Sequence, residues 1–416
     1  MRNTSRVSAG TPINNMTENL NFDDIRPYTD AEIPEVVASL VDDEEFMRAV
    51  AAIRFGGMPS FLFPLLKPVL RWRLRQYSTQ FKTIDDFQNS VEAYLQRAMD
   101  STSDSLVFVG DDRMESTKQY LFISNHRDIV LDPALSNLAL HRAGRKTHRI
   151  AIGDNLLSKP FASKLMRINK SFIVKRAVGS GRERLRELKK LSSYIRYSLS
   201  KDNECVWIAQ SEGRAKDGVD SSDPALIKML TLGKPKAESF SKAIRDLNIL
   251  PIAVSYEWDP CDLAKARELA VLEKNGEYLK AEHEDIDSIA AGIQGFKGAV
   301  QLTFGEPLVD DYESPEEVAR AIDEQILAMY KIHASNLSAY RKVFGQLPKG
   351  IVETYSDEKL SAADAMLDAR TAQLSKSEGA ILIQAYANPV VRRLKLVEEK
   401  QESTLSKEHE TDSLDQ

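Results

Sequence analysis

The chain has 416 residues, of which 42% are hydrophobic and 28% are charged, and its formal net charge is -6. This composition supplies enough apolar material for a sizeable core, and the acidic balance excludes a protein that coats nucleic acid along its whole surface. Its two cysteines, Cys205 and Cys261, lie far apart, so neither a disulfide framework nor a zinc knuckle is indicated and a reducing cytoplasm is the expected setting.

The N-terminal part is expected to be a leader followed by helices. Residues 1–29 begin with basic residues that no hydrophobic stretch follows, and we predict a disordered leader there. Residues 30–117 carry apolar residues at spacings of three and four, which predicts a helical region. No apolar run approaches the roughly 20 residues that a spanning helix needs, so we expect a protein that is neither secreted nor membrane-spanning.

One segment of this helical region has two open interpretations. Residues 58–75 join a short apolar block to a basic one that contains Arg71, Trp72, Arg73 and Arg75. Such a segment suits a bilayer surface, with apolar groups at the acyl boundary and arginines on lipid phosphates. It equally suits a core helix with a solvated basic end, and three prolines interrupt the block.

Residues 118–310 alternate short apolar runs with helical patterns. The pattern predicts an α/β domain whose buried strands are covered by helices, for example a helix over 182–199. The predicted strands lie at 120–123, 149–152, 172–174, 205–208, 250–256 and 300–304.

The C-terminal part reads as a helical region over 311–398 and a polar tail. Ser314, Pro315 and Glu317 form a good helix start, with a capping hydroxyl, proline at the first position and an acid three residues after the cap. We expect that helix to run to about Ser335. Residues 399–416 hold little that could be buried, which predicts a disordered tail.

A histidine with nearby acids is the sharpest chemical feature. His126 follows the strand at 120–123, and Asp128 and Asp132 follow it by two and six residues. Open α/β folds hold ligands at the carboxyl ends of their strands, and an imidazole steadied by a carboxylate can act as a general base. The alternative is a polar loop whose histidine caps a helix.

Two groups of basic residues follow. Residues 159–190 contain eleven Lys or Arg against two Glu, with Lys175 and Arg176 just after a predicted strand. A second loop, residues 210–218, carries Arg214 and Lys216 after the next strand. Cations converging near a histidine suit a phosphate-bearing substrate, whereas singly they would be solvated helix faces or incidental turn charges.

Taken in order, four stretches resemble the motifs of the glycerolphosphate acyltransferase superfamily. The first is a His followed by an Asp, the second an apolar strand with a basic residue, the third a Glu-Gly pair with an Arg, and the fourth a proline-led strand. They are matched by Asn125-His126 with Leu131-Asp132-Pro133, by 172–176, by Glu212-Gly213-Arg214 and by 250–254. Tyr256-Glu257 and 304–307 look more like the glycerol-3-phosphate branch than the lysophosphatidate branch.

The resemblance covers about 118–310 and implies a mixed central sheet flanked by helices, with helical additions at both ends. It implies that His126, oriented by Asp132, acts as base, and that Lys175, Arg176, Glu212, Gly213 and Arg214 bind substrate. Two departures stand out: five residues rather than four separate His126 from Asp132, so Asp128 is an alternative partner, and no residue separates Gly213 from Arg214.

The implied reaction moves a fatty acyl group from acyl-CoA or acyl-carrier protein to glycerol-3-phosphate or 1-acyl-glycerol-3-phosphate. It needs no metal or other cofactor, and we expect a cytoplasmic enzyme of phospholipid biosynthesis, attached peripherally to a membrane surface and without a nucleic-acid partner. Two rival hypotheses remain: a non-catalytic lipid-binding protein on this fold, and a hydrolase of thioesters or phosphate esters that uses the same histidine.

Overall fold

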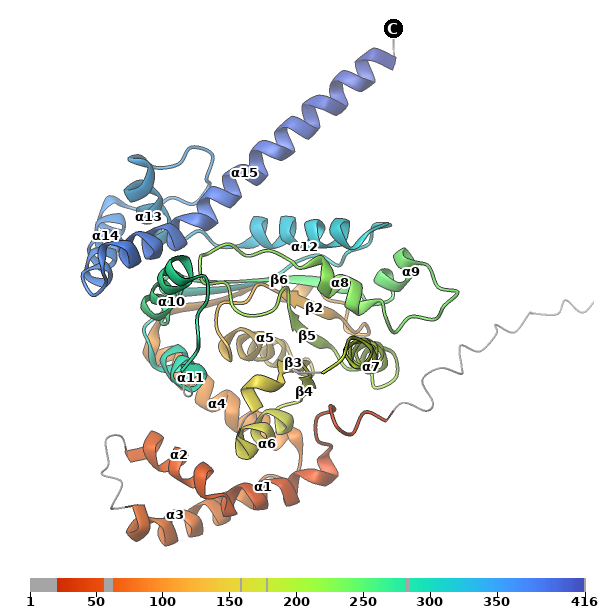
Figure 1. Cartoon of the computed structure of the whole chain (residues 1–416), viewed down its shortest axis with the longest axis vertical. Helices are drawn as coiled ribbons and strands as arrows, with labels where there is room; N and C mark the ends of the chain where they lie inside the picture. Colours follow the sequence, from red (N-terminus) through yellow and green to blue (C-terminus); the bar gives the residue numbers. More distant parts are fainter. Residues whose placement is uncertain (1–20, 56–62, 158, 177–178, 282–283, 415–416) are drawn as a thin grey trace, which may run out of the picture.

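The computed structural model describes residues 21–55, 63–157, 159–176, 179–281 and 284–414. At its centre is a sheet of seven strands in the order β1-β7-β6-β2-β5-β3-β4 (Figure 1). All neighbouring strands are parallel except β6 and β7, which are antiparallel, so the sheet is mixed as the resemblance implied. The strands are β1 (Ser103–Val109), β2 (Leu121–Ser124), β3 (Arg149–Gly153), β4 (Ser171–Val174), β5 (Val206–Ala209), β6 (Ile249–Tyr256) and β7 (Gly298–Phe304).

Two apolar layers sandwich the sheet because the central strands are buried on both faces. Within β2, Leu121 and Ile123 join one core cluster, whereas Phe122 between them joins the other, as the two-residue period of a strand requires. The first face is covered by α7 (Gly181–Ser200), α8 (Pro224–Leu230), α9 (Phe240–Arg245) and α12 (Pro315–Met329), and the second by α4 (Ile84–Thr102) and α5 (Leu131–Arg142).

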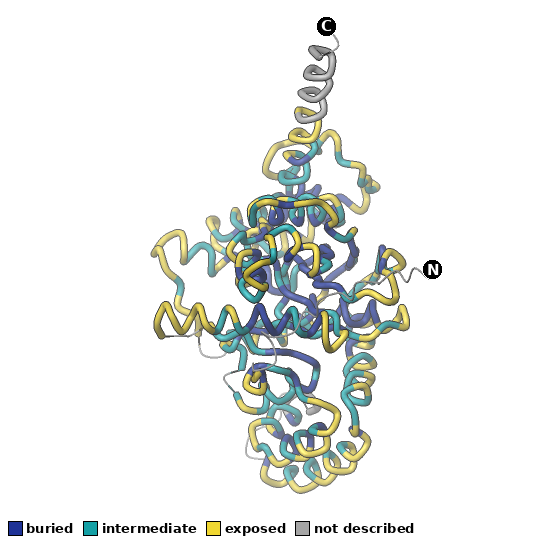
Figure 2. The backbone as a smooth tube through the Cα atoms, turned by 90° about the vertical axis from the view of Figure 1, so that its right-hand side faces the viewer, coloured by how far each residue is buried: buried dark blue, intermediate teal, exposed yellow. Residues whose placement is uncertain are grey.

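The remaining helices form additions around this core. The buried residues gather towards the centre of the molecule (Figure 2). The N-terminal helices are α1 (Ile33–Asp42), α2 (Glu44–Phe55) and α3 (Phe63–Ser78). Within the domain lie α6 (Pro160–Ile168), α10 (Asp262–Asn275) and α11 (Glu284–Gln294). The C-terminal helices are α13 (Ala334–Phe344), α14 (Asp357–Thr371) and α15 (Lys376–Leu414). Within the described ranges, no helix is both long and apolar enough to cross a bilayer.

Six predicted strands are found as β2 to β7, and the sequence missed β1. This strand lies at the sheet edge and pairs only with β7, so it is partly exposed and its sequence is not continuously apolar. The sheet therefore begins at Ser103 rather than at 118, and the predicted N-terminal helical region contains a strand. The helix expected to reach Ser335 ends at Met329, although its cap is as predicted, with Ser314 Oγ accepting from Glu317 N.

Both predicted disordered ends are wrong where the structure describes them. Phe22 and Ile25 are buried in the core cluster of α7 and β5, and Phe22 packs 5.1 Å from the ring of Tyr194. Residues 21–29 are therefore part of the fold, and residues 1–20 lie outside the described ranges. In the predicted tail, α15 continues to Leu414 and extends away from the body (Figure 1).

Candidate active site

Most of the predicted site residues meet at the carboxyl ends of the parallel strands. Strands β6, β2, β5, β3 and β4 run parallel, so their carboxyl ends lie on the same side. His126 follows β2, Arg176 follows β4, and Glu212-Gly213-Arg214 follows β5. The topology therefore brings together residues that lie up to 88 positions apart in the chain.

His126 and Asp132 form the predicted pair. His126 Nδ1 lies 2.9 Å from Asp132 Oδ2, and the Asp132 side chain is fully buried while that of His126 is 16% exposed. The indole of Trp207 on β5 meets the imidazole edge to face, with the ring centroids 5.7 Å apart. Nε2 of His126 has no hydrogen bond to any residue in the described ranges, so this nitrogen is open to a ligand.

Asp132 is fixed by further donors. Its Oδ2 also accepts from the backbone N–H of Arg127 at 2.6 Å and of Asp128 at 2.9 Å, and its Oδ1 accepts from the Tyr256 hydroxyl at 2.7 Å. Because a buried carboxylate is stabilised only where hydrogen bonds replace water, these donors explain how Asp132 remains at the start of α5 without exposure.

The other candidate acid, Asp128, has a structural role. Its Oδ1 accepts from the backbone N–H groups of Val130 and Leu131, the two residues at which α5 begins. Burial, and then the charge of Asp132, raise the pKa of Asp128. The longer spacer is therefore accommodated as a turn at 127–130, and Asp132 is the partner of His126.

Asn125 ties the histidine loop to the sheet. Its side-chain amide donates to the carbonyl of Val254 at 2.9 Å, and its Oδ1 accepts from the Val254 N–H at 2.7 Å. On the other side, the carbonyl of His126 accepts from the N–H of Ala215 at 2.9 Å. The histidine is thus held between β6 and the loop that carries Arg214.

His126 lines a cleft of about 290 Å³ whose lining contains both apolar and charged side chains. The apolar ones include Ile129, Val130, Pro133, Ile150, Ile152, Leu156, Met166 and Trp207, and the charged ones include Arg176, Glu212, Arg214, Lys216, Lys280 and Asp285. A ligand with an apolar chain and an anionic head matches both kinds of side chain.

Arg214 differs from the other cations of the cleft. Arg176 lies 3.3 Å from Glu212, Lys216 pairs with Glu268, and Lys280 lies 2.8 Å from Asp285. Arg214, by contrast, has no carboxylate partner within the described ranges; its Nη2 lies 3.5 Å from Ser288 Oγ, and its buried Nη1 has no hydrogen bond there. A guanidinium placed in this way has a charge and donors left for an anion.

Lys175 does not line the cleft. Its Nζ pairs with Asp24 and lies 3.3 Å from Glu187 on α7. The hydrogen bond to Asp24 raises the pKa of Lys175 despite some burial. Of the two basic residues predicted to bind substrate at this strand end, Arg176 lines the cleft and Lys175 does not. Gly213 contributes its backbone: its φ of +83° is one that glycine adopts without strain.

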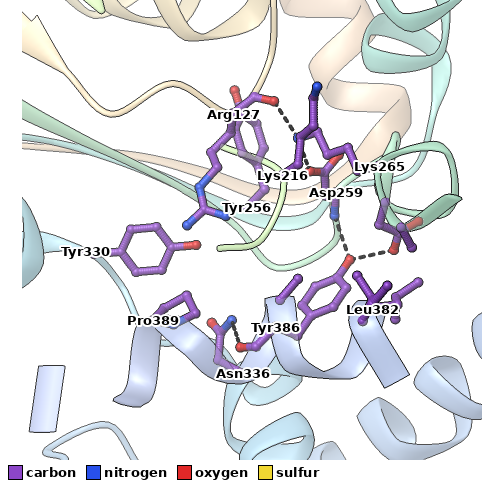
Figure 3. Close-up of a pocket in the computed structure, with 14 residues that line it drawn as sticks. Arg127, Lys216, Tyr256, Asp259, Lys265, Tyr330, Asn336, Leu382, Tyr386 and Pro389 are labelled. Atoms are coloured by element: carbon purple, nitrogen blue, oxygen red, sulfur yellow. Dashed lines mark hydrogen bonds and ion pairs between the residues drawn. The ribbon is translucent and has the colours of Figure 1, made fainter. Parts of the chain in front are cut away.

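The C-terminal helix α15 supports the Arg214 loop from the side away from His126. Asn388 Nδ2 donates to the carbonyl of Asp217 at 2.7 Å. Gly218 has a φ of +76°, and a Cβ there would lie 2.0 Å from the carbonyl oxygen of Ala385. In Figure 3, Leu382, Tyr386 and Pro389 face Arg127 and Lys216 across a small cavity of about 40 Å³.

Several site residues were not found from the sequence. Tyr256 was noted only for its resemblance to one branch, and nothing signalled its contact with Asp132. The segment 262–298, to which the sequence assigned no role, supplies Lys280 and Asp285 to the cleft and Ser288 to Arg214. Within the described ranges, no group of three or more His, Cys, Asp and Glu side chains could hold a metal ion.

The fold and the site define an α/β protein with a histidine–aspartate pair in the same cleft as Arg214, which has no carboxylate partner in the part of the chain that the structure describes. Residues 105–255 match the family model described as Acyltransferase, so this part of the chain is an acyltransferase domain and the superfamily indicated by the motifs is confirmed. No curated protein sequence matches the chain.

Among solved structures, the chain is similar to one titled as the 1-acyl-sn-glycerophosphate (LPA) acyltransferase PlsC from Thermotoga maritima. The sequence identity is 15%, the match covers 70% of this chain and 94% of that one, and the TM-score is 0.32.

Proposed function

We propose that this acyltransferase moves a fatty acyl group from a thioester, acyl-CoA or acyl-carrier protein, to the hydroxyl of a glycerol phosphate. The observation that carries the proposal is that one cleft holds both His126, with Nε2 open, and Arg214, with no carboxylate partner in the described ranges. His126 is suited to remove a proton from an alcohol, and Arg214 is suited to bind a phosphate on the same molecule.

The reaction follows from this arrangement in two steps. Nε2 of His126 takes the proton of the acceptor hydroxyl as its oxygen bonds to the thioester carbonyl carbon, and Asp132 stabilises the imidazolium that forms. The tetrahedral intermediate then expels the sulfur, the carbonyl re-forms as an ester, and the imidazolium returns the proton to the thiolate. The apolar side chains of the cleft accommodate the acyl chain, and Arg176 and Arg214 hold the acceptor phosphate, with Glu212 ordering Arg176.

Substitution of His126 tests the reaction. We expect His126→Ala to lower thiol release from a long-chain acyl-CoA by roughly 10²- to 10⁴-fold, because general-base catalysis contributes about that factor. Thiol release with glycerol-3-phosphate and with 1-acyl-glycerol-3-phosphate, and the masses of the lipid products, would be measured. His141→Ala is the control, since His141 lies outside the cleft and is exposed.

Three outcomes would count against this account. Unchanged thiol release in His126→Ala would remove the histidine from the mechanism. Free fatty acid as the product, with acceptor unused, would favour the hydrolase. Vesicle binding by the wild-type protein without turnover on either acceptor would favour a non-catalytic lipid-binding protein.

The acceptor site predicts different effects for two cations. Arg214→Met should raise the KM for the phosphate acceptor by about 10- to 100-fold, as expected for loss of a charge-assisted hydrogen bond worth about 1.5–3 kcal/mol. Lys175→Met removes the same charge at a position paired with Asp24 and Glu187. The KM of this variant for the phosphate acceptor should stay within about twofold of the wild-type value. Equal KM values for both variants and the wild type would contradict the assignment of Arg214 to the acceptor phosphate.

We further propose that α3 attaches the enzyme to a lipid surface in the cytoplasm. Leu65, Val69 and Trp72 are 74%, 59% and 58% exposed and lie at positions i, i+4 and i+7, on one face of the helix. Arg73 stands beside Trp72, whereas Arg71 and Arg75 pair with Asp42. Residues 58–62 of the predicted segment lie outside the described ranges.

Co-sedimentation with phosphatidylcholine vesicles that contain phosphatidylglycerol tests this surface. The double variant Leu65→Glu/Val69→Glu should lose most of its vesicle binding, because the charges oppose burial of that face in the acyl boundary. Val352→Glu, at a position 90% exposed in another part of the chain, should bind as the wild type does. Wild-type binding by the double variant would show that α3 is not the lipid contact.

A further inference from the structure

Tyr256 lies behind the catalytic pair, on the side of Asp132 away from His126. It is the last residue of β6, is buried, and donates its hydroxyl hydrogen to Asp132 Oδ1 at 2.7 Å. It also lines the small cavity of Figure 3 together with Arg127 and Lys216, and it is not among the residues that line the cleft with His126. Tyr256 therefore contacts the carboxylate of the pair without reaching the reacting atoms.

The hydrogen bonds of Asp132 are divided unequally between its two oxygens. Oδ2 takes three of them, from His126 and from two backbone N–H groups, whereas within the described ranges Oδ1 takes only that of Tyr256. Without the hydroxyl, one oxygen of a fully buried carboxylate would have no donor there. The hydroxyl also fixes the rotation of the carboxylate plane, because donors then act on both oxygens.

The cations near Tyr256 do not replace its hydroxyl as the donor to Asp132 Oδ1. The nearby cations have other partners: Arg127 lies 2.5 Å from Asp220, Lys216 pairs with Glu268, and Lys265 pairs with Asp259. Burial, and then the charges of Asp132 and Asp128, raise the pKa of Tyr256 well above its usual range. The hydroxyl consequently keeps its proton near neutral pH and stays a donor to Oδ1.

We propose that Tyr256 is a positioning residue that holds Asp132 in the orientation that meets Nδ1 of His126 and limits how strongly this carboxylate stabilises the imidazolium. The first effect favours catalysis because Nε2 stays directed to the acceptor. The second keeps the imidazole neutral, and able to accept a proton, at a lower pH. The catalytic part of this inference rests on the proposed acyl transfer, whereas the effect on His126 itself does not.

The variant Tyr256→Phe removes only the hydroxyl. The negative charge on Asp132 then loses one donor, so the imidazolium gains stability and the titration of His126 moves to higher pH. We expect the midpoint of that titration, followed by NMR of the ring signals, and the acid limb of kcat/KM to rise together by about 0.5–1 unit. We expect kcat to fall by about tenfold or more and the acceptor KM to change by less than about threefold, because the lost contact lies outside the substrate cleft.

Tyr330→Phe is the matched control. Tyr330 lines the same cavity and is buried, but its hydroxyl has no hydrogen bond in the described ranges and it does not contact Asp132. Both the titration and kcat should match the wild type in this variant. Melting temperatures of all three proteins would separate loss of the hydrogen bond from general loss of stability.

Two results would overturn the proposal. One is an unchanged His126 titration in Tyr256→Phe, whatever the activity. The other is a titration that shifts equally in Tyr256→Phe and Tyr330→Phe. If the wild-type protein transfers no acyl group, the NMR titration still decides the role of Tyr256, so this outcome is distinguishable from failure of the proposed function.

Discussion

The site depends on one buried carboxylate. Asp132 has no exposed surface, and an ionised group in that position is tolerated only if hydrogen bonds and a partner replace the water it has lost. The donors come from the loop that carries His126 and from Tyr256 on β6, which are separated by more than a hundred residues in the chain. The requirement to satisfy Asp132 therefore fixes the loop shape, the orientation of the imidazole and the approach of β6 to α5.

A second constraint keeps the histidine close to the cations. Asn125 is bonded to β6, His126 is bonded through its carbonyl to the loop of Arg214, and α15 packs closely against the far side of that loop at Gly218. The five residues between His126 and Asp132 include the turn at 127–130, and the two side chains still meet at 2.9 Å. The C-terminal helix α15 thus supports the loop that carries Arg214.

The sequence revealed features that depend on local pattern and missed those that depend on distant neighbours. Six strands could be predicted because they are buried on both faces and therefore continuously apolar, whereas β1 is partly exposed at an edge. The pair His126–Asp132 and the cation Arg214 were recognisable from motif order. Lys175 looked equally suitable, and only the positions of Asp24 and Glu187, which the fold brings to it, distinguish it from Arg214.

The central claim is that Asp132 fixes the imidazole with its Nδ1 protonated and Nε2 free to act as base. The most direct measurement is an NMR spectrum that correlates the ring nitrogens of His126 with its carbon-bound protons, recorded above the pH at which this histidine titrates. Our account predicts a protonated nitrogen at Nδ1 and an unprotonated one at Nε2 in the wild-type protein. The opposite assignment in Asp132→Leu is compatible with this account, because that variant lacks the carboxylate that accepts from Nδ1. A proton on Nε2 in the wild-type protein, or rapid exchange between both forms, would contradict it.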